Sequence, residues 1–236
     1  MLNVQNLHAS YGRLRALSGV TFSVAAGEIV TILGRNGSGR STTCKAIIGM
    51  VPPTTGQVEL RNRNLAGLPP HQIARAGIGY VPEERRIFGQ LTVEENLQLG
   101  MQPLRSGSSV AEWRMDDLYA KFPRLHERRH VKAGFLSGGE QQVLTIFRTL
   151  LGNPLAILID EPTEGLAPMI VDVVSDLVVE MKQRGLGIVL MEQKLAMALR
   201  LADRVLVMGR GQIVFSGSPA AFEASSELRK QWLEVA

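Results

Sequence analysis

The distribution of apolar and polar positions along this chain predicts a mixed α/β fold. Three short runs are rich in apolar and β-branched residues, at 28–33, 155–159 and 187–191. Uninterrupted apolar runs such as 155–159 are typical of strands that are buried on both faces of a parallel sheet. Between the last two runs, Pro168 suits the start of a helix and Gly185 its end. Strand, helix and strand in succession indicate helices packed on a parallel sheet.

Shorter strand patterns lie toward both ends of the chain. The first two predict an antiparallel flank, and a turn at 52–56 precedes a further strand. Near the C-terminal end, the turn Gly209-Arg210-Gly211 predicts a hairpin, and polar helices follow it. The expected strands are 2–7, 20–24, 57–60, 204–208 and 212–215, and the expected helices lie within 219–235.

Residues 87–151 differ in character from both neighbouring segments and are predicted to be mainly helical. Thr92 is followed by Glu95 at the spacing of a capping box, which predicts the start of a helix. Residues 102–109 contain proline, glycine and three serines, so a flexible break is expected there. The segment therefore predicts a helical subdomain inserted between two parts of an α/β core.

A glycine-rich octamer, GRNGSGRS at 34–41, lies between the predicted strand at 28–33 and a predicted helix at 41–48. It fits the phosphate-loop pattern G-x-x-x-x-G-K-[ST], except that Arg40 replaces the lysine. Its glycines let backbone N–H groups converge on a polyphosphate, and the helix adds its positive dipole end. A turn that merely joins strand to helix is the alternative. The expected nucleotide ligands here are Gly34, Arg35, Asn36, Gly37, Ser38, Gly39, Arg40, Ser41 and Thr42.

Two acids, Asp160 and Glu161, stand where the apolar run 155–159 is predicted to end. Ligands bind at such carboxyl ends of parallel strands. Beside a polyphosphate, Asp160 and the Ser41 hydroxyl are expected to hold Mg²⁺, and Glu161 to polarise an attacking water. Strand-end acids that simply face solvent are the alternative.

The length of the chain limits the number of domains, and the arrangement of its charges argues against one class of partner. A chain of 236 residues permits one large or two small domains and a sizeable core. The net charge of +4 comes from separated arginine clusters without interleaved aromatic residues, which argues against a nucleic-acid surface. Acidic lipid headgroups or acidic loops of a partner are equally compatible with these clusters.

The single cysteine, Cys44, excludes an intrachain disulfide and fits a reducing cytoplasm. No signal peptide is expected at the start of the chain, and no apolar run approaches the ~18 residues that a membrane span needs. Any transport path is therefore expected to belong to other polypeptides.

The pentamer at 126–130, HERRH, matches the zinc-protease pattern H-E-x-x-H. It follows Pro123, contains two arginines and has no evident third ligand, whereas a zinc helix needs a packed apolar face. A solvated charged loop is the prediction for this segment.

The heptapeptide LSGGEQQ at 136–142 stands between the phosphate loop and the acidic strand end. Ser137 with Glu140 forms a second capping-box pattern, which would aim a helix N-terminus outward as an anion site. An ordinary helix start satisfies the same pattern. The order of the three motifs is nevertheless more specific than any one of them.

With these motifs the chain resembles, over almost its whole length, the ATP-binding subunit of an ABC transporter. The resemblance implies an α/β fold with a P-loop NTPase (RecA-like) core, an antiparallel β flank and a helical subdomain. It implies one ATP-binding domain, with 1–86 and 152–236 as the catalytic core and 87–151 as the helical subdomain. Two such subunits would enclose ATP, so that Ser137, Gly138, Gly139 and Glu140 of one copy bind the nucleotide of the other.

Further residues acquire expected roles from the resemblance alone. Tyr11 matches the aromatic residue that stacks on adenine, although a strand-edge tyrosine is the alternative. Glu83 stands where the family has a glutamine that approaches the nucleotide and Mg²⁺, and Gln193 stands in place of the switch histidine, beside the catalytic Glu161. The segment 83–96 matches the region that contacts the membrane partner, and a purely structural helix-loop-helix remains open for it.

The combination VPE at 81–83, LTVEENL at 91–97 and MEQ at 191–193 is similar to one ATP-binding subunit of branched-chain amino acid importers, with urea importers as close neighbours. We therefore expect an ATPase at the cytoplasmic face of the inner membrane, with permeases, a second ATP-binding subunit and, indirectly, a solute-binding protein as partners. A slow ATP switch caused by Arg40, or a soluble ABC machine, are the rival hypotheses. The solute and the identity of the second subunit are not determined by the sequence.

Overall fold

The computed structural model describes residues 1–105, 107–108 and 110–233, and its centre is a mostly parallel sheet. Six strands in the described residues pair in the order β10-β9-β3-β8-β7-β6, and only β10 is antiparallel to its neighbour. The three predicted apolar runs form its adjacent central strands, β3, β8 and β7. The strands are β3 (Ile29–Leu33), β6 (Ile78–Val81), β7 (Ala156–Asp160), β8 (Gly187–Met191), β9 (Arg204–Gly209) and β10 (Gln212–Gly217).

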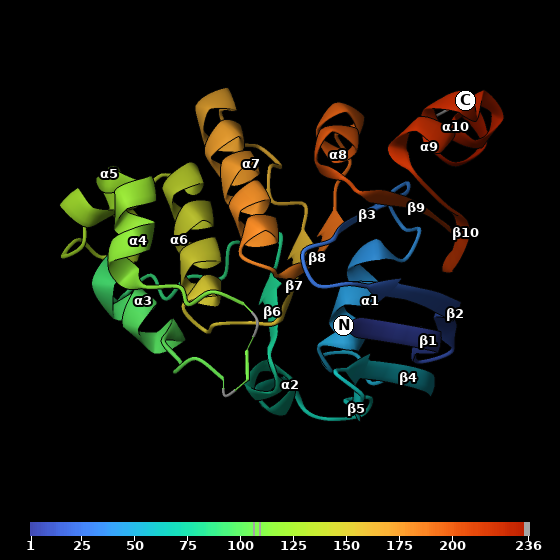
Figure 1. Cartoon of the computed structure of the whole chain (residues 1–236), viewed down its shortest axis with the longest axis horizontal. Coiled ribbons are helices and arrows are strands. Elements are labelled where there is room, and N and C mark those ends of the chain that lie inside the picture. The colour runs from blue at the N-terminus through green and yellow to red at the C-terminus, as the bar shows by residue number, and fades with distance from the viewer. Residues whose placement is uncertain (106, 109, 234–236) are drawn as a thin grey trace.

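A second, antiparallel sheet lies beside the first, at the lower right of Figure 1. Its order is β2-β1-β4-β5, and register shifts interrupt the pairing of β1 with β2. The predicted antiparallel flank is confirmed, although both of its first strands are longer than expected because the bulged pairing continues to Tyr11. The strands are β1 (Leu2–Tyr11), β2 (Leu14–Val24), β4 (Thr55–Leu60) and β5 (Arg63–Asn64).

Helices cover the parallel sheet and extend away from it. The longest described helix, α7, begins at Pro168, and Gly185 beyond its end has φ +91°, as the sequence predicted. The helices are α1 (Arg40–Ile47), α2 (Pro70–Ala76), α3 (Val93–Gly100), α4 (Met115–Lys121), α5 (Pro123–Glu127), α6 (Gly138–Leu150), α7 (Pro168–Gln183), α8 (Leu195–Leu201), α9 (Pro219–Ala224) and α10 (Ser226–Trp232), with a 3₁₀ turn at Ala133–Phe135.

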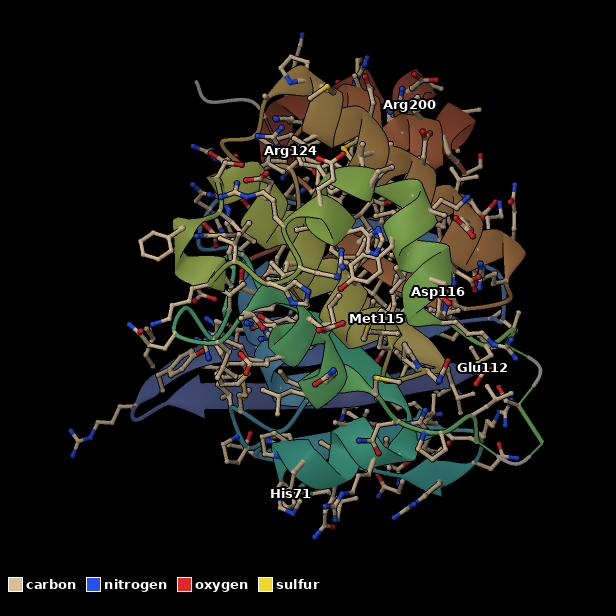
Figure 2. The ribbon with its side chains drawn as sticks, turned by 90° about the vertical axis from the view of Figure 1, so that its left-hand side faces the viewer. His71, Glu112, Met115, Asp116, Arg124 and Arg200 are labelled. Carbon is tan, nitrogen blue, oxygen red and sulfur yellow. The ribbon has the colours of Figure 1, made fainter. Side chains whose placement is uncertain are left out.

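Helices α3 to α6 gather on the side of the molecule remote from the antiparallel sheet (Figure 1). Figure 2 looks onto this end, with Met115 and Asp116 of α4 toward the viewer and His71 of α2 below them. The capping boxes of Thr92 with Glu95 and of Ser137 with Glu140 both form as predicted. Residues 102–105 adopt no regular structure, whereas positions 106 and 109 of the expected break lie outside the described residues.

The sequence missed strands β5 and β6 and helices α2 and α8, and it misread one further segment. These elements are short, although α2 does have a proline, Pro70, at its first position and a glycine, Gly77, in a left-handed conformation at its end. The charged loop predicted at 126–130 is wrong at its start, because α5 continues to Glu127 before the chain turns. His126 stacks on Tyr119, with ring centroids 4.7 Å apart, and this packing favours the helical turn.

One continuous apolar cluster joins the parallel sheet, the antiparallel sheet and the helices α3 to α6. Phe147 of α6 is fully buried in it, and fully burying a side chain of this kind stabilises the fold by about 1.5–3 kcal/mol. Within the described residues, none of the helices combines the length and the apolar character that a membrane span requires.

Candidate functional site

The phosphate loop lies between the carboxyl end of β3 and the first turn of α1. Gly39 precedes the helix with φ +111°, a left-handed conformation that glycine adopts without strain. A Cβ atom at Gly34 would lie 2.6 Å from the Met208 carbonyl oxygen and from Ser38 Oγ, so no side chain fits there. These two glycines let the loop fold tightly around the N-terminus of α1, as the sequence predicted.

Two buried polar atoms of the loop have no hydrogen-bond partner in the structure, namely Ser38 Oγ and Arg40 Nη1. A buried unpaired polar group is costly, and such groups in native structures call for a ligand, an ion or a water. Both atoms belong to a loop that lines a cavity of about 610 Å³. A phosphate oxygen would satisfy either donor, so the residues present fit a nucleotide polyphosphate.

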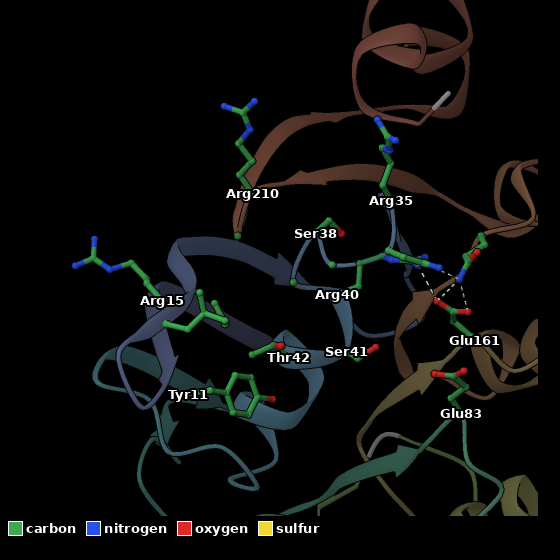
Figure 3. Close-up of a pocket in the computed structure, with 17 residues that line it drawn as sticks. Tyr11, Arg15, Arg35, Ser38, Arg40, Ser41, Thr42, Glu83, Glu161 and Arg210 are labelled. Atoms are coloured by element: carbon green, nitrogen blue, oxygen red, sulfur yellow. Dashed lines mark hydrogen bonds and ion pairs between the residues drawn. The ribbon is translucent and has the colours of Figure 1, made fainter. Parts of the chain in front are cut away.

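The walls of this cavity contain most of the residues that the sequence predicted (Figure 3). Gly34 contributes instead to a neighbouring cavity, which shares Arg35, Asn36 and Gln193 with the first. Asp160 lies at the phosphate loop through its contact with Ser41. The predicted residues on the cavity wall are Tyr11, Arg35, Asn36, Gly37, Ser38, Gly39, Arg40, Ser41, Thr42, Glu83, Glu161 and Gln193.

Asp160 ends strand β7, and its carboxylate accepts a hydrogen bond of 3.2 Å from the Ser41 hydroxyl. Burial raises the pKa of Asp160, an effect that the Ser41 hydrogen bond opposes. A divalent cation beside these oxygens would favour the ionised carboxylate. No cluster of three or more His, Cys, Asp or Glu side chains among the described residues could hold a metal by itself. Mg²⁺ therefore fits here as an ion shared between Ser41, Asp160 and phosphate oxygens, since Mg²⁺ commonly binds through few protein ligands.

Glu161 occupies an unusual backbone conformation and is tied to the phosphate loop. Its φ is +45°, and its backbone N–H donates to the Met191 carbonyl. Such strain in a residue other than glycine is typical of functional sites. Its carboxylate lies 2.7 Å from Arg40 Nη2, and both side chains are buried. The residue that departs from the phosphate-loop pattern thus contacts the proposed general base directly.

Gln193 and Asn36 complete this network. The Gln193 amide nitrogen lies 2.8 Å and 2.6 Å from the two Glu161 carboxylate oxygens and 3.0 Å from Asn36 Oδ1. Arg40 Nη2 also donates to Asn36 Oδ1 at 3.4 Å. The dashed lines of Figure 3 show the contacts of Glu161 with Arg40 and Gln193. Arg40 and Gln193 therefore hold the Glu161 carboxylate between them.

Glu192 is a site residue that sequence reasoning missed. It is buried, and its carboxylate accepts hydrogen bonds from the backbone N–H groups of Gln193 and Lys194 and from the Thr163 hydroxyl. These bonds fix the loop after β8, so that the Gln193 side chain is presented to Glu161. A charged residue at the end of an apolar strand was the available signal.

Five further residues of the cavity wall had no recognisable signal. They come from the start of β2 and from the β9–β10 turn, whose Gly211 N–H donates to the Ser38 carbonyl at 2.8 Å. Sequence alone does not show that these two segments meet the phosphate loop, although Figure 3 shows Arg15 and Arg210 at its rim. The residues are Leu14, Arg15, Ala16, Arg210 and Gly211.

The LSGGEQQ segment does not reach this cavity within one chain, because none of the residues from Ser137 to Glu140 lines it. Ser137 is exposed at the N-terminus of α6, where its Oγ accepts from the Glu140 backbone N–H at 3.3 Å. Glu140 Oε2 accepts from the Ser137 N–H at 2.7 Å. The segment is therefore a surface helix start, available to another molecule.

Glu140 is buried beneath this helix start and is held by two arginines of the preceding segment. Arg124 Nε lies 2.7 Å from Oε1, and Arg128 Nη1 lies 3.0 Å from Oε2. Figure 2 shows Arg124 on the helical end of the molecule. Burial by itself raises the pKa of Glu140, but hydrogen bonds from the Ser137 backbone and from Arg124 lower it to about 2.

We expect Glu140→Gln to lower the free energy of unfolding by about 1–3 kcal/mol at neutral pH, because it leaves two arginines without their carboxylate. The folded pKa of Glu140 lies below its ordinary value of 4.5, so its stabilisation is complete above that pH and is lost as the pH falls toward 2. Urea unfolding of both proteins at pH 7, 4 and 3 measures the difference.

The matched control is Glu127→Gln, because Glu127 is an exposed glutamate at the end of α5. It should leave the free energy of unfolding within about 0.5 kcal/mol at each pH. If the difference in free energy of unfolding between wild type and Glu140→Gln does not become smaller as the pH falls, the ionised Glu140 carboxylate does not stabilise the helix start as described.

A tight loop with unpaired donors at the N-terminus of α1, followed by a cation-competent Ser41–Asp160 pair at the carboxyl end of a parallel sheet, defines the class of phosphate-loop nucleotide-binding proteins. Residues 17–164 match the ABC transporter family, and the chain belongs to that family as an ATP-binding subunit. The predicted resemblance is confirmed.

Curated relatives cover the full length of the chain. It is 39% identical over 233 residues to the high-affinity branched-chain amino acid transport ATP-binding protein BraG of Pseudomonas aeruginosa, covering 99% of each chain. It is 32% identical to the lipopolysaccharide export system ATP-binding protein LptB of Acidithiobacillus ferridurans, covering 99% of this chain and 96% of the other. The LptB of Haemophilus influenzae is also 32% identical, covering 99% of this chain and 97% of the other.

Solved structures agree with the fold. An ATP-binding cassette of an ABC transporter in its ADP conformation superposes with a TM-score of 0.82 at 28% identity, covering 98% of this chain and 97% of the other. A nucleotide-free cassette superposes with a TM-score of 0.79 at 29% identity, covering 96% and 95%. The predicted α/β phosphate-loop fold is confirmed.

Proposed function

We propose that this chain binds and hydrolyses ATP to drive an importer for branched-chain or related amino acids. The observation that carries the proposal is the joining of the phosphate loop to the two acids at the end of β7, through Ser41 to Asp160 and through Arg40 to Glu161. A loop that only connected strand to helix would have no reason to bury these polar groups together.

The nucleotide-binding residues have distinct proposed roles. Tyr11, which is 48% exposed at the cavity wall, offers a ring face for adenine. The loop from Gly34 to Thr42 donates to the phosphates through backbone N–H groups and the N-terminus of α1. Ser41 and Asp160, with Glu83 on the same cavity wall, are the residues that would hold Mg²⁺. Bound Mg²⁺ supplies charge neutralisation at the phosphates.

For hydrolysis we assign the general base to Glu161 and its orientation to Gln193. The Gln193 amide contacts both carboxylate oxygens, so it can hold the carboxylate toward a water without competing for a proton. Arg40 forms an ion pair with the same carboxylate, through Oε1 at 2.7 Å. Arg40 and Gln193 thus both occupy the carboxylate that would have to contact the attacking water, and this supports a slow rate of hydrolysis.

We propose that two copies, or one copy and a related subunit, enclose the nucleotide. Ser137 and Gly139 lie at a surface helix start and outside their own chain's phosphate cavity. A second chain that faces this helix start brings its phosphates to the unsatisfied N–H groups of α6. The capping box keeps these residues in position for such a contact.

For the membrane partner we propose an apolar groove of about 610 Å³ between α2, α3 and α6. Phe88 and Leu99 on its wall are 53% and 58% exposed, so the groove presents apolar surface that a partner could cover. Asn96 fastens the loop that carries Phe88, because its amide pairs with both the N–H and the carbonyl of Phe88. The loop runs back to Glu83 at the nucleotide cavity, so the segment 83–96 can transmit movement from ATP to a permease.

The amino acid importer is preferred because the relative that transports branched-chain amino acids shares more of the sequence than the lipopolysaccharide export relatives do, 39% against 32%. A solute-binding protein would then deliver the solute from the other side of the membrane. The chain itself would lie on the cytoplasmic face of the inner membrane, bound to its permeases.

We expect a tagged copy, expressed in its source cells, to purify from detergent-solubilised membranes with a polytopic permease identified by mass spectrometry. Leu99→Asp should reduce this recovery at least about 10-fold, because it replaces an exposed apolar side chain of the groove wall with a carboxylate at the proposed contact with the permease. Val179→Asp is the matched control, since Val179 is an exposed apolar residue on α7, away from the groove.

Recovery of soluble partners in place of a permease, unaffected by Leu99→Asp, would contradict the importer and favour a soluble ABC machine. Reduced uptake of labelled leucine by cells that lack the chain would separate amino acid import from urea import and lipopolysaccharide export.

A further inference from the structure

Arg85 lies in the loop after β6 and is held in a strained backbone conformation, with φ +48°. The Ile87 N–H donates to the Arg85 carbonyl at 2.7 Å, which closes a tight turn at this residue. The turn directs a half-buried side chain away from its own loop. Strain of this kind persists only where surrounding contacts maintain it.

The Arg85 guanidinium connects two segments that are distant in the sequence. Its Nη2 donates a 2.8 Å hydrogen bond to the Glu164 carbonyl, in the turn after Glu161. Its Nη1 lies against the first residue of α6, since a Cβ atom placed on Gly138 would come within 2.4 Å of it. A Cβ atom on Gly165 would be 3.6 Å from Nη2. Arg85 therefore packs between the signature helix start and the 163–167 turn.

Neither of these two segments lines the phosphate cavity of the same chain, whereas Glu83, two residues before Arg85, does. Arg85 thus links the loop of its own subunit's nucleotide site to the surface formed by the start of α6 and the 163–167 turn. Under the proposed function, this surface completes the nucleotide site of a second subunit. A cation beside a helix N-terminus is unfavourable by itself, but it becomes favourable when an anion arrives. This charge arrangement suits a polyphosphate presented by another chain.

We propose that Arg85 is a positioning residue for the nucleotide held by the partner subunit. It fixes the Glu164 carbonyl and the first turn of α6 in the arrangement that receives the partner's phosphates, and its free donors add positive charge there. The inference rests on the proposed ATP-dependent pairing of two subunits. It assigns Arg85 no part in binding the nucleotide of its own subunit.

The first test distinguishes a role of Arg85 in its own subunit's nucleotide site from a role in the partner's site. Both measurements use a Glu161→Gln background. MgATP affinity of the isolated subunit is measured by calorimetry at low protein concentration, and MgATP-driven pairing by analytical ultracentrifugation. Arg85→Ala should change the affinity by less than about 2-fold but raise the MgATP concentration needed for pairing by about 10-fold or more, as expected for loss of a charged hydrogen bond.

Two companion variants test whether weaker pairing of Arg85→Ala comes only from a general disturbance of the loop. Arg85→Lys keeps a charged donor within reach of the Glu164 carbonyl and should restore most of the pairing. Arg86→Ala is the matched control, because Arg86 is exposed and its side chain pairs only loosely with Glu84, at 3.6 Å. It should pair like the parent protein.

The result that overturns the inference is an Arg85→Ala variant that loses MgATP affinity in the isolated subunit as much as it loses pairing, or one that pairs normally. Failure of the proposed function looks different, because the parent protein would then neither bind MgATP nor pair at any concentration.

A mixing experiment gives an independent answer. Ser41→Ala damages a subunit's own phosphate site, and Ser137→Ala damages the surface it offers to its partner. Ser41→Ala mixed with Arg85→Ala should pair as well as Ser41→Ala mixed with Ser137→Ala, because each mixture contains one complete site. Pairing by the Ser137→Ala mixture alone would place Arg85 in its own subunit's site and contradict the inference.

Discussion

Replacement of Arg40 by lysine is expected to raise the steady-state rate of phosphate release by about 10-fold to 100-fold, in line with the cost of misplacing one transition-state contact. The buried Arg40–Glu161 pair, at 2.7 Å, directs the guanidinium toward the proposed base. Lysine offers a compact charge that can follow the β- and γ-phosphates, whereas the guanidinium is planar and wider.

The physical reason is a competition for one carboxylate. While Arg40 and Gln193 both contact Glu161, its charge is neutralised and its orientation fixed. Lysine should contact Glu161 less closely than the planar guanidinium does, which leaves the carboxylate free to accept a hydrogen bond from water. The rate is measured by coupled phosphate detection at saturating MgATP.

Arg210→Lys is the matched control, because Arg210 lines the same cavity but projects from its rim (Figure 3). It retains the charge and should leave the rate within about 2-fold, as expected for an exposed charge-conserving change. Equal rates for wild type and Arg40→Lys would remove the idea that Arg40 slows hydrolysis.

Glu161→Gln should lower phosphate release by about 10²–10⁴-fold, the contribution of a positioned general base. The loss should be clearest in the Arg40→Lys background, where the starting rate is expected to be higher. The glutamine retains an amide oxygen that can accept from Arg40, so the fold should survive. An alanine at this position would instead leave a buried guanidinium unpaired, at a cost of about 3–5 kcal/mol.

The control for Glu161→Gln is Glu223→Gln, an exposed glutamate on α9, and its phosphate release should match wild type. A Glu161→Gln protein that releases phosphate at the wild-type rate would exclude Glu161 as the base.

Much of the fold was predictable because its strongest signals are local. The buried strand runs, the glycine-rich loop and both capping boxes need only neighbouring residues, and each is present. Strand β6 and helix α2 were missed because they are short and depend on packing against β7 and the parallel sheet. Tertiary context decides such segments more than propensity does.

The candidate site was predictable as a set of motifs but not as a network. Arg40 and Glu161 are 121 positions apart, and nothing local indicates that their side chains form an ion pair. The contact of the Glu161 backbone with Met191 and the hydrogen bond from Thr163 to Glu192 likewise need β7 and β8 to lie side by side. The contact of Arg85 with Gly138 joins the loop after β6 to the start of α6 in the same way.

The most direct measurement of the central claim is a calorimetric titration of MgATP into the folded Glu161→Gln variant, in which turnover does not obscure the heat of binding. We predict saturable binding of about one ATP per chain at cellular, millimolar nucleotide concentrations, as expected for a complete phosphate loop. The absence of any binding heat, from protein that unfolds cooperatively in urea, would contradict a nucleotide site at 34–41 and the functions built on it.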